Sequence, residues 1–136
     1  MKTDSTNTKV LLLGYTGYIG AAVAKVLLEK NIEVICPIRN KKPLEKVKNI
    51  IFVDMCQIES FLETSKEKPT TVISCIASRK GGTLDSWNVE YTLNKFFLNL
   101  CKRVGIKRFI LLSAICVQKP SLEFQKAKLA FEDLLK

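Results

Sequence analysis

Three glycines near the start of the chain have the spacing of a phosphate-binding turn. Gly14, Gly17 and Gly20 follow the apolar run 10–13, and after them apolar residues recur every three or four positions. This change of period predicts a strand, a tight turn and a helix. In such a unit the backbone N–H groups and the positive end of the helix dipole face an anion, for instance the diphosphate of a dinucleotide.

Each glycine has its own expected role in this turn. Gly14 lets the chain leave the strand sharply, Gly17 lets the backbone approach the diphosphate, and Gly20 lets the helix pack tightly on the strand. The alternative is an ordinary glycine-rich loop. The strand predicted before the turn and the helix predicted after it argue against this alternative. We predict that the cofactor contacts the whole turn, which consists of Gly14, Tyr15, Thr16, Gly17, Tyr18, Ile19 and Gly20.

A basic residue follows the second predicted strand. Arg39 stands where the adenosine ribose lies in such sheets, and its planar guanidinium suits a 2′-phosphate, whereas an acidic residue would favour the ribose hydroxyls of NAD. Lys41 and Lys42 add positive charge nearby. This arrangement predicts NADPH as the cofactor; the alternative is that Arg39 is a solvated loop residue. Asp54, at the end of the third predicted strand, is expected beside the adenine.

The loop after the fourth predicted strand is a further candidate region. Ala77 and Ser78 end that strand at the sheet edge where open α/β sheets bind ligands, so we expect both to bind the cofactor. Arg79 is a candidate partner for a phosphate or a substrate carboxylate, with a solvated loop charge as the equal alternative. Asp85 or Ser86 is expected to cap the helix that follows.

The elements that must position these residues alternate between strands and helices. Strands are expected at 10–13, 33–38, 50–53, 72–76 and 109–113, and helices after the glycine turn and at 57–66, 87–103 and 122–136. This alternation predicts a doubly wound, Rossmann-like α/β fold with a parallel sheet of about five strands in the order 3-2-1-4-5. We expect one NAD(P)-binding domain over residues 1–136, with residues 1–8 as a flexible tail.

Helical spacing predicts which residues face the core. For the first helix these are Ile19, Ala22, Val23, Val26 and Leu27. For the last helix they are Phe124, Ala127, Phe131 and Leu134.

Composition excludes several other kinds of site. The 136 residues contain no histidine, which excludes Ser-His-Asp triads, Cys-His pairs and histidine-ligated metals. Five scattered cysteines form no C-x-x-C pair, so we expect buried free thiols and no metal site. The net charge of +9 is spread along the whole length, which favours an anionic small ligand over nucleic acid.

The sequence predicts neither a transmembrane segment nor a secretory signal. No apolar run approaches the roughly 20 residues of a membrane span, and the polar start, MKTDSTNTK, lacks the apolar core of a signal peptide. We therefore expect the chain to work in a cytoplasm or a similarly reducing compartment.

Three stretches of the sequence are similar to a known family. They are GYTGYIG from Gly14, SCIASRKGGTLDSWNVEY from Ser74, and FILLSAICVQKPSLEFQKAKLAFE from Phe109. In them the chain resembles the atypical short-chain dehydrogenase/reductases and, among these, the divinyl (proto)chlorophyllide a 8-vinyl-reductases of chlorophyll biosynthesis. The first stretch is shared by many reductases, whereas the other two are long and specific. Family members are much longer, so the resemblance concerns their N-terminal, cofactor-binding part.

The resemblance implies an oxidoreductase that uses NADPH on a tetrapyrrole substrate. Hydride goes to the conjugated 8-vinyl group of divinyl (proto)chlorophyllide a, and a proton completes the ethyl group. Ordinary members of the short-chain dehydrogenase/reductase superfamily use a serine and a Tyr-x-x-x-Lys pair. Ser113 matches the serine position, and Lys128 ends a Tyr-x-x-x-Lys frame in which Phe124 replaces the tyrosine, so both are candidate catalytic residues. Phenylalanine has no proton to give, which disfavours alcohol–ketone chemistry and suits reduction of a carbon–carbon double bond. Lys128 would bind the nicotinamide ribose or stabilise negative charge; the alternative is a solvated lysine.

The resemblance leaves other points open. Trp87 and Tyr91 are candidates for contact with a macrocycle, although aromatic residues on such a helix are more often part of the core. A non-catalytic NADP(H)-binding redox sensor is the alternative function. For the chain by itself we expect NADPH binding with little or no turnover. Self-association through an incomplete face, peripheral association with photosynthetic membranes, and a plastid stroma as the compartment are all compatible with the resemblance.

Overall fold

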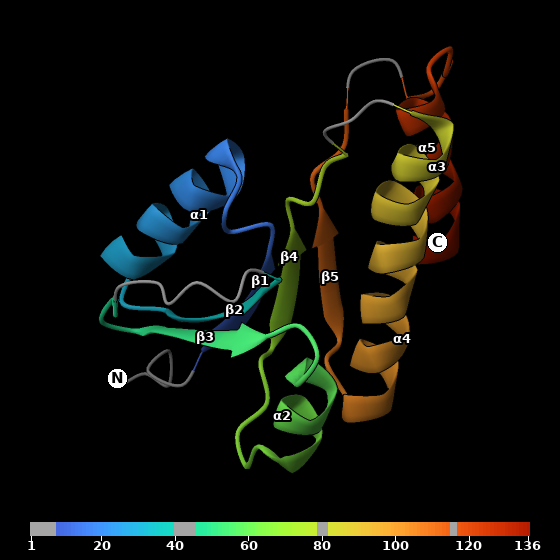
Figure 1. The fold of residues 1–136 in the computed structure, drawn as a ribbon. Coiled ribbons are helices and arrows are strands. Elements are labelled where there is room, and N and C mark those ends of the chain that lie inside the picture. The colour runs from blue at the N-terminus through green and yellow to red at the C-terminus, as the bar shows by residue number, and fades with distance from the viewer. Residues whose placement is uncertain (1–7, 40–45, 79–81, 115–116) are drawn as a thin grey trace.

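A parallel sheet of five strands forms the centre of the structure, a computed structural model that describes residues 8–39, 46–78, 82–114 and 117–136. The strands lie in the order β3-β2-β1-β4-β5 (Figure 1). Their bounds are β1 (Lys9–Leu13), β2 (Glu33–Ile38), β3 (Ile50–Asp54), β4 (Thr71–Ser74) and β5 (Arg108–Leu111). The predicted Rossmann-like fold and strand order are therefore confirmed.

The strand order creates a switch point beside β1. The chain builds outward from β1 to β2 and β3, and then returns to the other side of β1 with β4 and β5. All neighbours are parallel; for example, Leu11 pairs with Ile35 on β2 and with Val72 on β4. The carboxyl ends of β1, β2 and β4 therefore meet at the position where open α/β sheets bind ligands.

Helices cover both faces of this sheet (Figure 1). One face carries α1 (Tyr18–Glu29), and the other carries α2 (Ile58–Thr64) and a long helical segment. That segment consists of α3 (Thr83–Ser86), the π-helical η2 (Trp87–Leu93) and α4 (Asn94–Val104). The last helix, α5 (Glu123–Leu135), packs against η2. Within the described part of the chain, no helix combines the length and apolarity needed to cross a bilayer.

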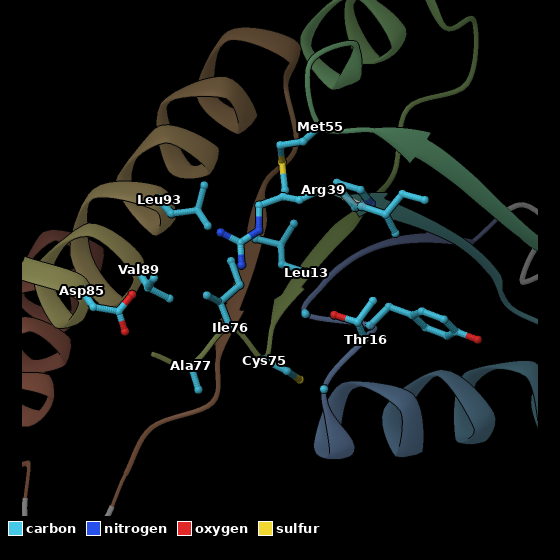
Figure 2. Close-up of a pocket in the computed structure, with 15 residues that line it drawn as sticks. Leu13, Thr16, Arg39, Met55, Cys75, Ile76, Ala77, Asp85, Val89 and Leu93 are labelled. Carbon is cyan, nitrogen blue, oxygen red and sulfur yellow. The ribbon is translucent and has the colours of Figure 1, made fainter. Parts of the chain in front are cut away.

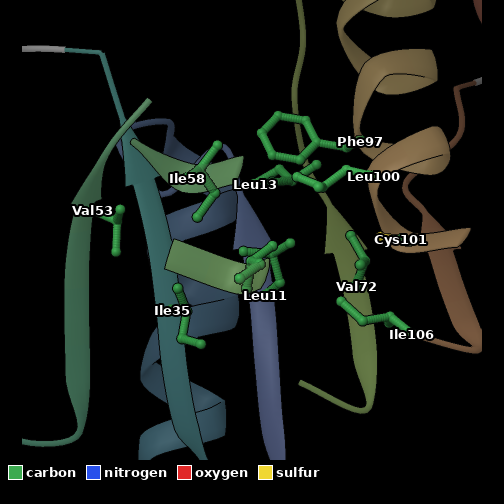
Figure 3. Close-up of a cluster of buried hydrophobic side chains, with 11 residues drawn as sticks. Leu11, Leu13, Ile35, Val53, Ile58, Val72, Phe97, Leu100, Cys101 and Ile106 are labelled. Atoms are coloured by element: carbon green, nitrogen blue, oxygen red, sulfur yellow. The ribbon is translucent and has the colours of Figure 1, made fainter. Parts of the chain in front are cut away.

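Two apolar clusters, one on each face, hold the helices to the sheet. Alternate residues of β1 divide between them: Leu11 and Leu13 join the cluster that includes α2 and α4, whereas Val10 and Leu12 join the cluster that includes α1. Figure 3 shows the first cluster, in which Phe97 of α4 lies next to Leu13. Each large side chain buried in this way contributes roughly 1.5–3 kcal/mol of transfer free energy.

Most of the described cysteines lie in this core. Cys36, Cys75 and Cys101 are buried free thiols, as predicted, whereas Cys56 is exposed; Cys116 lies outside the described residues. Burial raises the pKa of the Cys36 and Cys101 thiols to about 12, because the thiolate would lose its hydration. At neutral pH both behave as small apolar side chains.

The buried face of α1 differs from the predicted one. Gly20, Ala24 and Leu27 are buried, whereas Ile19 and Val26 are each 49% exposed. The prediction was right for Leu27 and wrong for Ile19, Ala22 and Val26. The physical reason is the absence of a side chain at Gly20, which lets the helix approach along the line of small residues.

The helix after β4 begins earlier than the predicted start at Trp87. It starts at Thr83 with Gly82 as its N-cap residue and no capping side chain, so Asp85 and Ser86 are helical residues and not caps. The following residues form η2, in which Glu90 is buried. A π-helical turn inside an α-helix frequently marks a functional site.

The last helix also buries a residue that its spacing did not predict. Ala127 and Phe131 are buried as expected, but Leu134 is 40% exposed and Lys128 is buried. The buried lysine therefore needs a charged partner inside the protein.

Gly20→Ser is expected to destabilise the fold. A Cβ at position 20 would lie 1.9 Å from the carbonyl oxygen of Gly14, so the turn or the helix must move. We expect the free energy of unfolding, measured by urea denaturation, to fall by about 1–3 kcal/mol, as in other overpacked sites.

Gly82→Ser is the matched control for this prediction. Gly82 lies at the start of another helix, as the N-cap residue of α3, and a Cβ there meets no atom within 4 Å. We expect its free energy of unfolding to stay within about 0.5 kcal/mol of the original. Equal losses in the two variants would contradict the close contact at Gly20.

Candidate functional site

The glycine turn between β1 and α1 forms one wall of the site. Gly14 has a φ of +90°, which side-chain-bearing residues rarely adopt, and a Cβ there would lie 2.7 Å from the carbonyl oxygen of Cys75. The Gly17 N–H donates to the Gly14 carbonyl oxygen at 3.1 Å and closes the turn. No side chain of the described residues caps the start of α1. The first N–H groups of this helix are thus left for an anion.

A pocket of about 660 Å³ opens at this turn (Figure 2). It is lined by the turn at 13–17, the end of β2 at 37–39, Met55 after β3, the segment 75–77 after β4, and helical residues including Val89. The volume falls within the range of roughly 300–1,000 Å³ that is usual for small-molecule sites. The pocket therefore lies at the switch point, where the fold predicts a ligand.

Within the turn, the structure separates lining residues from supporting ones. Four of the predicted residues line the pocket: Gly14, Tyr15, Thr16 and Gly17. The other three do not: Tyr18 is 93% exposed, Ile19 is half-exposed, and Gly20 is buried against the backbone of the turn. Cofactor contacts of these three residues stay a prediction.

Arg39 lines the pocket from the end of β2. Figure 2 shows its guanidinium extending across the pocket toward Ile76 and Leu93. The side chain is exposed, so it can turn toward a ligand. Lys41 and Lys42 lie outside the described residues.

Asp54, expected beside the adenine, is not among the lining residues. Its Oδ1 accepts a hydrogen bond from the N–H of Cys56 at 2.8 Å, and the next residue, Met55, lines the pocket. The carboxylate thus closes the turn after β3, and its contact with a cofactor stays a prediction.

Ala77 lines the pocket, whereas Ser78 points toward a glutamate. The N–H and the Oγ–H of Ser78 both donate to Oε2 of Glu90, at 2.8 and 2.9 Å. The sequence reasoning missed Glu90, because a glutamate on a helix usually belongs to the solvated face. A signal was present: Glu90 and Asn94 continue, at spacings of four and three, the buried line through Phe97. Arg79 lies outside the described residues.

Lys128 joins this polar cluster, and Ser113 does not. Nζ of Lys128 lies 2.9 Å from Oε1 of Glu90 in a buried ion pair without directed hydrogen-bond geometry, and it donates to the Leu112 carbonyl oxygen at 3.0 Å. Ser113 is exposed and donates to Glu132 at 2.7 Å. The alternative of a solvated Lys128 does not fit, whereas the catalytic roles of Lys128 and Ser113 stay predictions.

Trp87 and Tyr91 pack against each other and not into the pocket. Their rings meet edge to face with centroids 5.6 Å apart, and Nε1 of Trp87 donates to Glu123 on α5 at 3.0 Å. Of the two alternatives, contact with a macrocycle or a structural role, this arrangement favours the structural role, because it joins η2 to α5.

The thiol of Cys75, in the pocket wall, senses the charge of Lys128. Cys75 lines the pocket, and burial raises the pKa of its thiol. The positive charge of Lys128 offsets part of this rise in pKa. The ammonium is thus within electrostatic reach of the pocket wall. Among the described residues, no group of three or more His, Cys, Asp or Glu side chains could hold a metal ion.

Comparison with known proteins identifies the family. The model of the NAD dependent epimerase/dehydratase family matches residues 10–133. The chain belongs to this family. Membership supports a nicotinamide cofactor, and the site fits one: the turn excludes side chains at 14 and 20, the start of α1 is uncapped, and Arg39 stands at one end.

Curated relatives confirm the resemblance seen in the sequence. A protein named divinyl chlorophyllide a 8-vinyl-reductase, chloroplastic, from Arabidopsis thaliana is 43% identical over 139 residues, which cover 90% of this chain and 33% of the relative. The protein of the same name from Cucumis sativus is 38% identical over 141 residues, 93% of this chain and 34% of the relative. The chain therefore spans about a third of the length of these relatives.

A solved structure has the same fold as this chain. The Bordetella bronchiseptica enzyme WbmG in complex with NAD matches with a TM-score of 0.78 and 16% identity over 95% of this chain and 49% of that one. At this identity the likeness concerns the fold alone.

Proposed function

We propose that this chain binds NADPH in the pocket at the glycine turn and forms the cofactor-binding part of a divinyl chlorophyllide a 8-vinyl-reductase. The observation that carries the proposal is the 43% identity to a relative of that name over 90% of the chain. The uncapped start of α1 and the position of Arg39 give independent support for an anionic dinucleotide.

The chain's own contribution to such a reaction is binding and orientation. When bound, the nicotinamide would supply a hydride to the 8-vinyl group. Main-chain amides of residues 14–17 would hold the diphosphate, and Arg39 would pair with the 2′-phosphate. The segment 75–77 would carry the nicotinamide half, since β4 lies on the opposite side of β1 from β2. Fixing both ends of the cofactor presents one face of the nicotinamide to the substrate.

The residues around Lys128 suit reduction of a carbon–carbon double bond. Phe124, at the tyrosine position of the superfamily frame, has no proton to exchange with an alcohol or a ketone. The Lys128 ammonium would stabilise negative charge that develops on the substrate or would bind the nicotinamide ribose. Ser113 could take part only by giving up its hydrogen bond to Glu132.

The names of the relatives also suggest the compartment in which this chain works. The names of the curated plant relatives place those proteins in the chloroplast. We propose the plastid stroma for this chain if its source is a photosynthetic eukaryote, and the cytoplasm otherwise.

The proposed reaction predicts that this chain can replace the matching part of a relative. Residues 10–133, grafted into the Arabidopsis relative in place of its aligned third, should give a chimera that reduces divinyl chlorophyllide a with NADPH. The shift of the red absorption band measures the conversion. The chain alone should give little or no turnover. A folded chimera that binds NADPH without reducing the pigment, or full turnover by the chain alone, would contradict the proposal.

Arg39→Asp is expected to weaken NADPH binding far more than NADH binding. Losing the pairing with the 2′-phosphate should cost on the order of 1.5–3 kcal/mol of binding free energy, measured by calorimetry. Arg108→Asp is the matched control, because it makes the same charge change at the amino end of β5, away from the pocket. Equal weakening of both nucleotides by Arg39→Asp would show that Arg39 does not select the cofactor.

A further inference from the structure

The buried carboxylate of Glu90 links two parts of the molecule that are far apart in sequence. Its side chain is 2% exposed, and its two oxygens have different partners. Oε1 lies 2.9 Å from Nζ of Lys128 on α5, and Oε2 accepts the N–H and the Oγ–H of Ser78 after β4. One side chain from η2 therefore fixes both α5 and the segment that lines the pocket.

A second layer of hydrogen bonds holds Glu90 itself. Nδ2 of Asn94 donates to the Glu90 carbonyl oxygen at 2.9 Å, and Oγ–H of Ser74 donates to Oδ1 of Asn94 at 2.5 Å. Ser74 and Asn94 are fully buried. The end of β4 thus holds the π-helical turn, and the turn sets the direction of the carboxylate.

Stability alone does not account for this ion pair. Removing two charges from water offsets most of their attraction, so a buried pair can often be replaced by apolar side chains without loss of stability. What the pair does provide is direction: Glu90 and the Leu112 carbonyl oxygen hold the Lys128 ammonium beyond the carboxyl ends of β4 and β5. The same carboxylate binds Ser78, which directly follows the pocket-lining segment 75–77.

The strand order tells which half of a dinucleotide this ammonium would meet. Arg39 follows β2 on one side of the glycine turn, and Cys75 follows β4 on the other. A dinucleotide with its diphosphate on the turn and its 2′-phosphate at Arg39 has its nicotinamide ribose on the β4 side. An ammonium has three N–H donors, more than the Leu112 carbonyl oxygen uses.

We propose that Glu90 is a positioning residue for the nicotinamide half of the cofactor, an inference that rests on the proposed NADPH binding. It holds the Lys128 ammonium and the segment 75–78 in the arrangement that receives the nicotinamide ribose. Glu90 itself does not touch the cofactor; it acts through Lys128 and Ser78.

Two ligands that share the adenosine half test this proposal. NADPH spans the whole pocket, whereas adenosine 2′,5′-bisphosphate carries the 2′-phosphate and lacks the nicotinamide half. Glu90→Gln keeps an oxygen acceptor for Ser78 and removes the charge that holds Lys128. We expect the Kd for NADPH to rise about tenfold, the effect of losing one charge-assisted hydrogen bond from Lys128 to the nicotinamide ribose. The Kd for the bisphosphate should change less than about twofold, since its contacts are on the Arg39 side.

Glu59→Gln is the matched control. It removes a carboxylate from an exposed ion pair, in which Oε2 of Glu59 lies 3.0 Å from Arg103, on a different part of the surface. Neither Kd should change. This control separates the effect of Glu90 from a general effect of one lost negative charge.

The outcomes distinguish this inference from the function on which it rests. If the unaltered chain binds neither ligand, the proposed function fails and the role of Glu90 with it. If the unaltered chain binds both, and folded Glu90→Gln binds NADPH unchanged or loses both ligands equally, the positioning role is wrong. Should Glu90→Gln not fold, the double variant E90M/K128M removes both charges together; unchanged NADPH binding by that variant would overturn the proposal.

Discussion

The close contact between the turn after β1 and the first turn of α1 governs the geometry of the site. Gly20 approaches the Gly14 carbonyl oxygen so closely that a Cβ would lie 1.9 Å from it, and Gly14 is similarly close to the backbone of Cys75. Three backbone segments therefore meet where no side chain fits. Because α1 is drawn in this far, its uncapped start opens toward the pocket. An anion at this point meets main-chain N–H groups and the positive end of the helix dipole.

Side chains form a polar cluster next to the segment that lines the pocket after β4. Glu90, Lys128 and Ser78 form a polar cluster that joins η2, α5 and the segment after β4. Glu90 and Lys128 are buried and Ser78 is partly buried, so packing restricts the geometry of the ion pair. The backbone of the glycine turn therefore lies on one side of the switch point, and the polar cluster of Glu90, Lys128 and Ser78 lies on the other.

The sheet and the glycine turn could be predicted from sequence, because both depend on local patterns. The strands of a parallel sheet are buried on both faces, so their sequences are short apolar runs. β1 is such a strand, because four of its five residues are buried. The orientation of α1 could not be predicted, since Ile19 and Val26 have the right spacing but the tertiary contact at Gly20 decides which side faces the sheet.

Side-chain partners at the site were the least predictable feature. Glu90 has helical spacing to the buried Asn94 and Phe97, but this spacing does not show that a carboxylate on this line is paired with Lys128 on a distant helix. Ser113 has the expected place after β5, but its hydroxyl bonds to Glu132, nineteen residues later. This pairing depends on how α5 packs against the end of β5, and the spacing of residues within one segment does not predict such packing.

Amide chemical shifts of the ¹⁵N-labelled chain during an NADPH titration test the central claim most directly. If the diphosphate lies on the main-chain amides of the turn, the largest shifts will fall on Gly14, Thr16 and Gly17, with smaller shifts at Cys75 and Ala77. A folded chain whose turn amides keep their shifts at saturating NADPH would contradict the account.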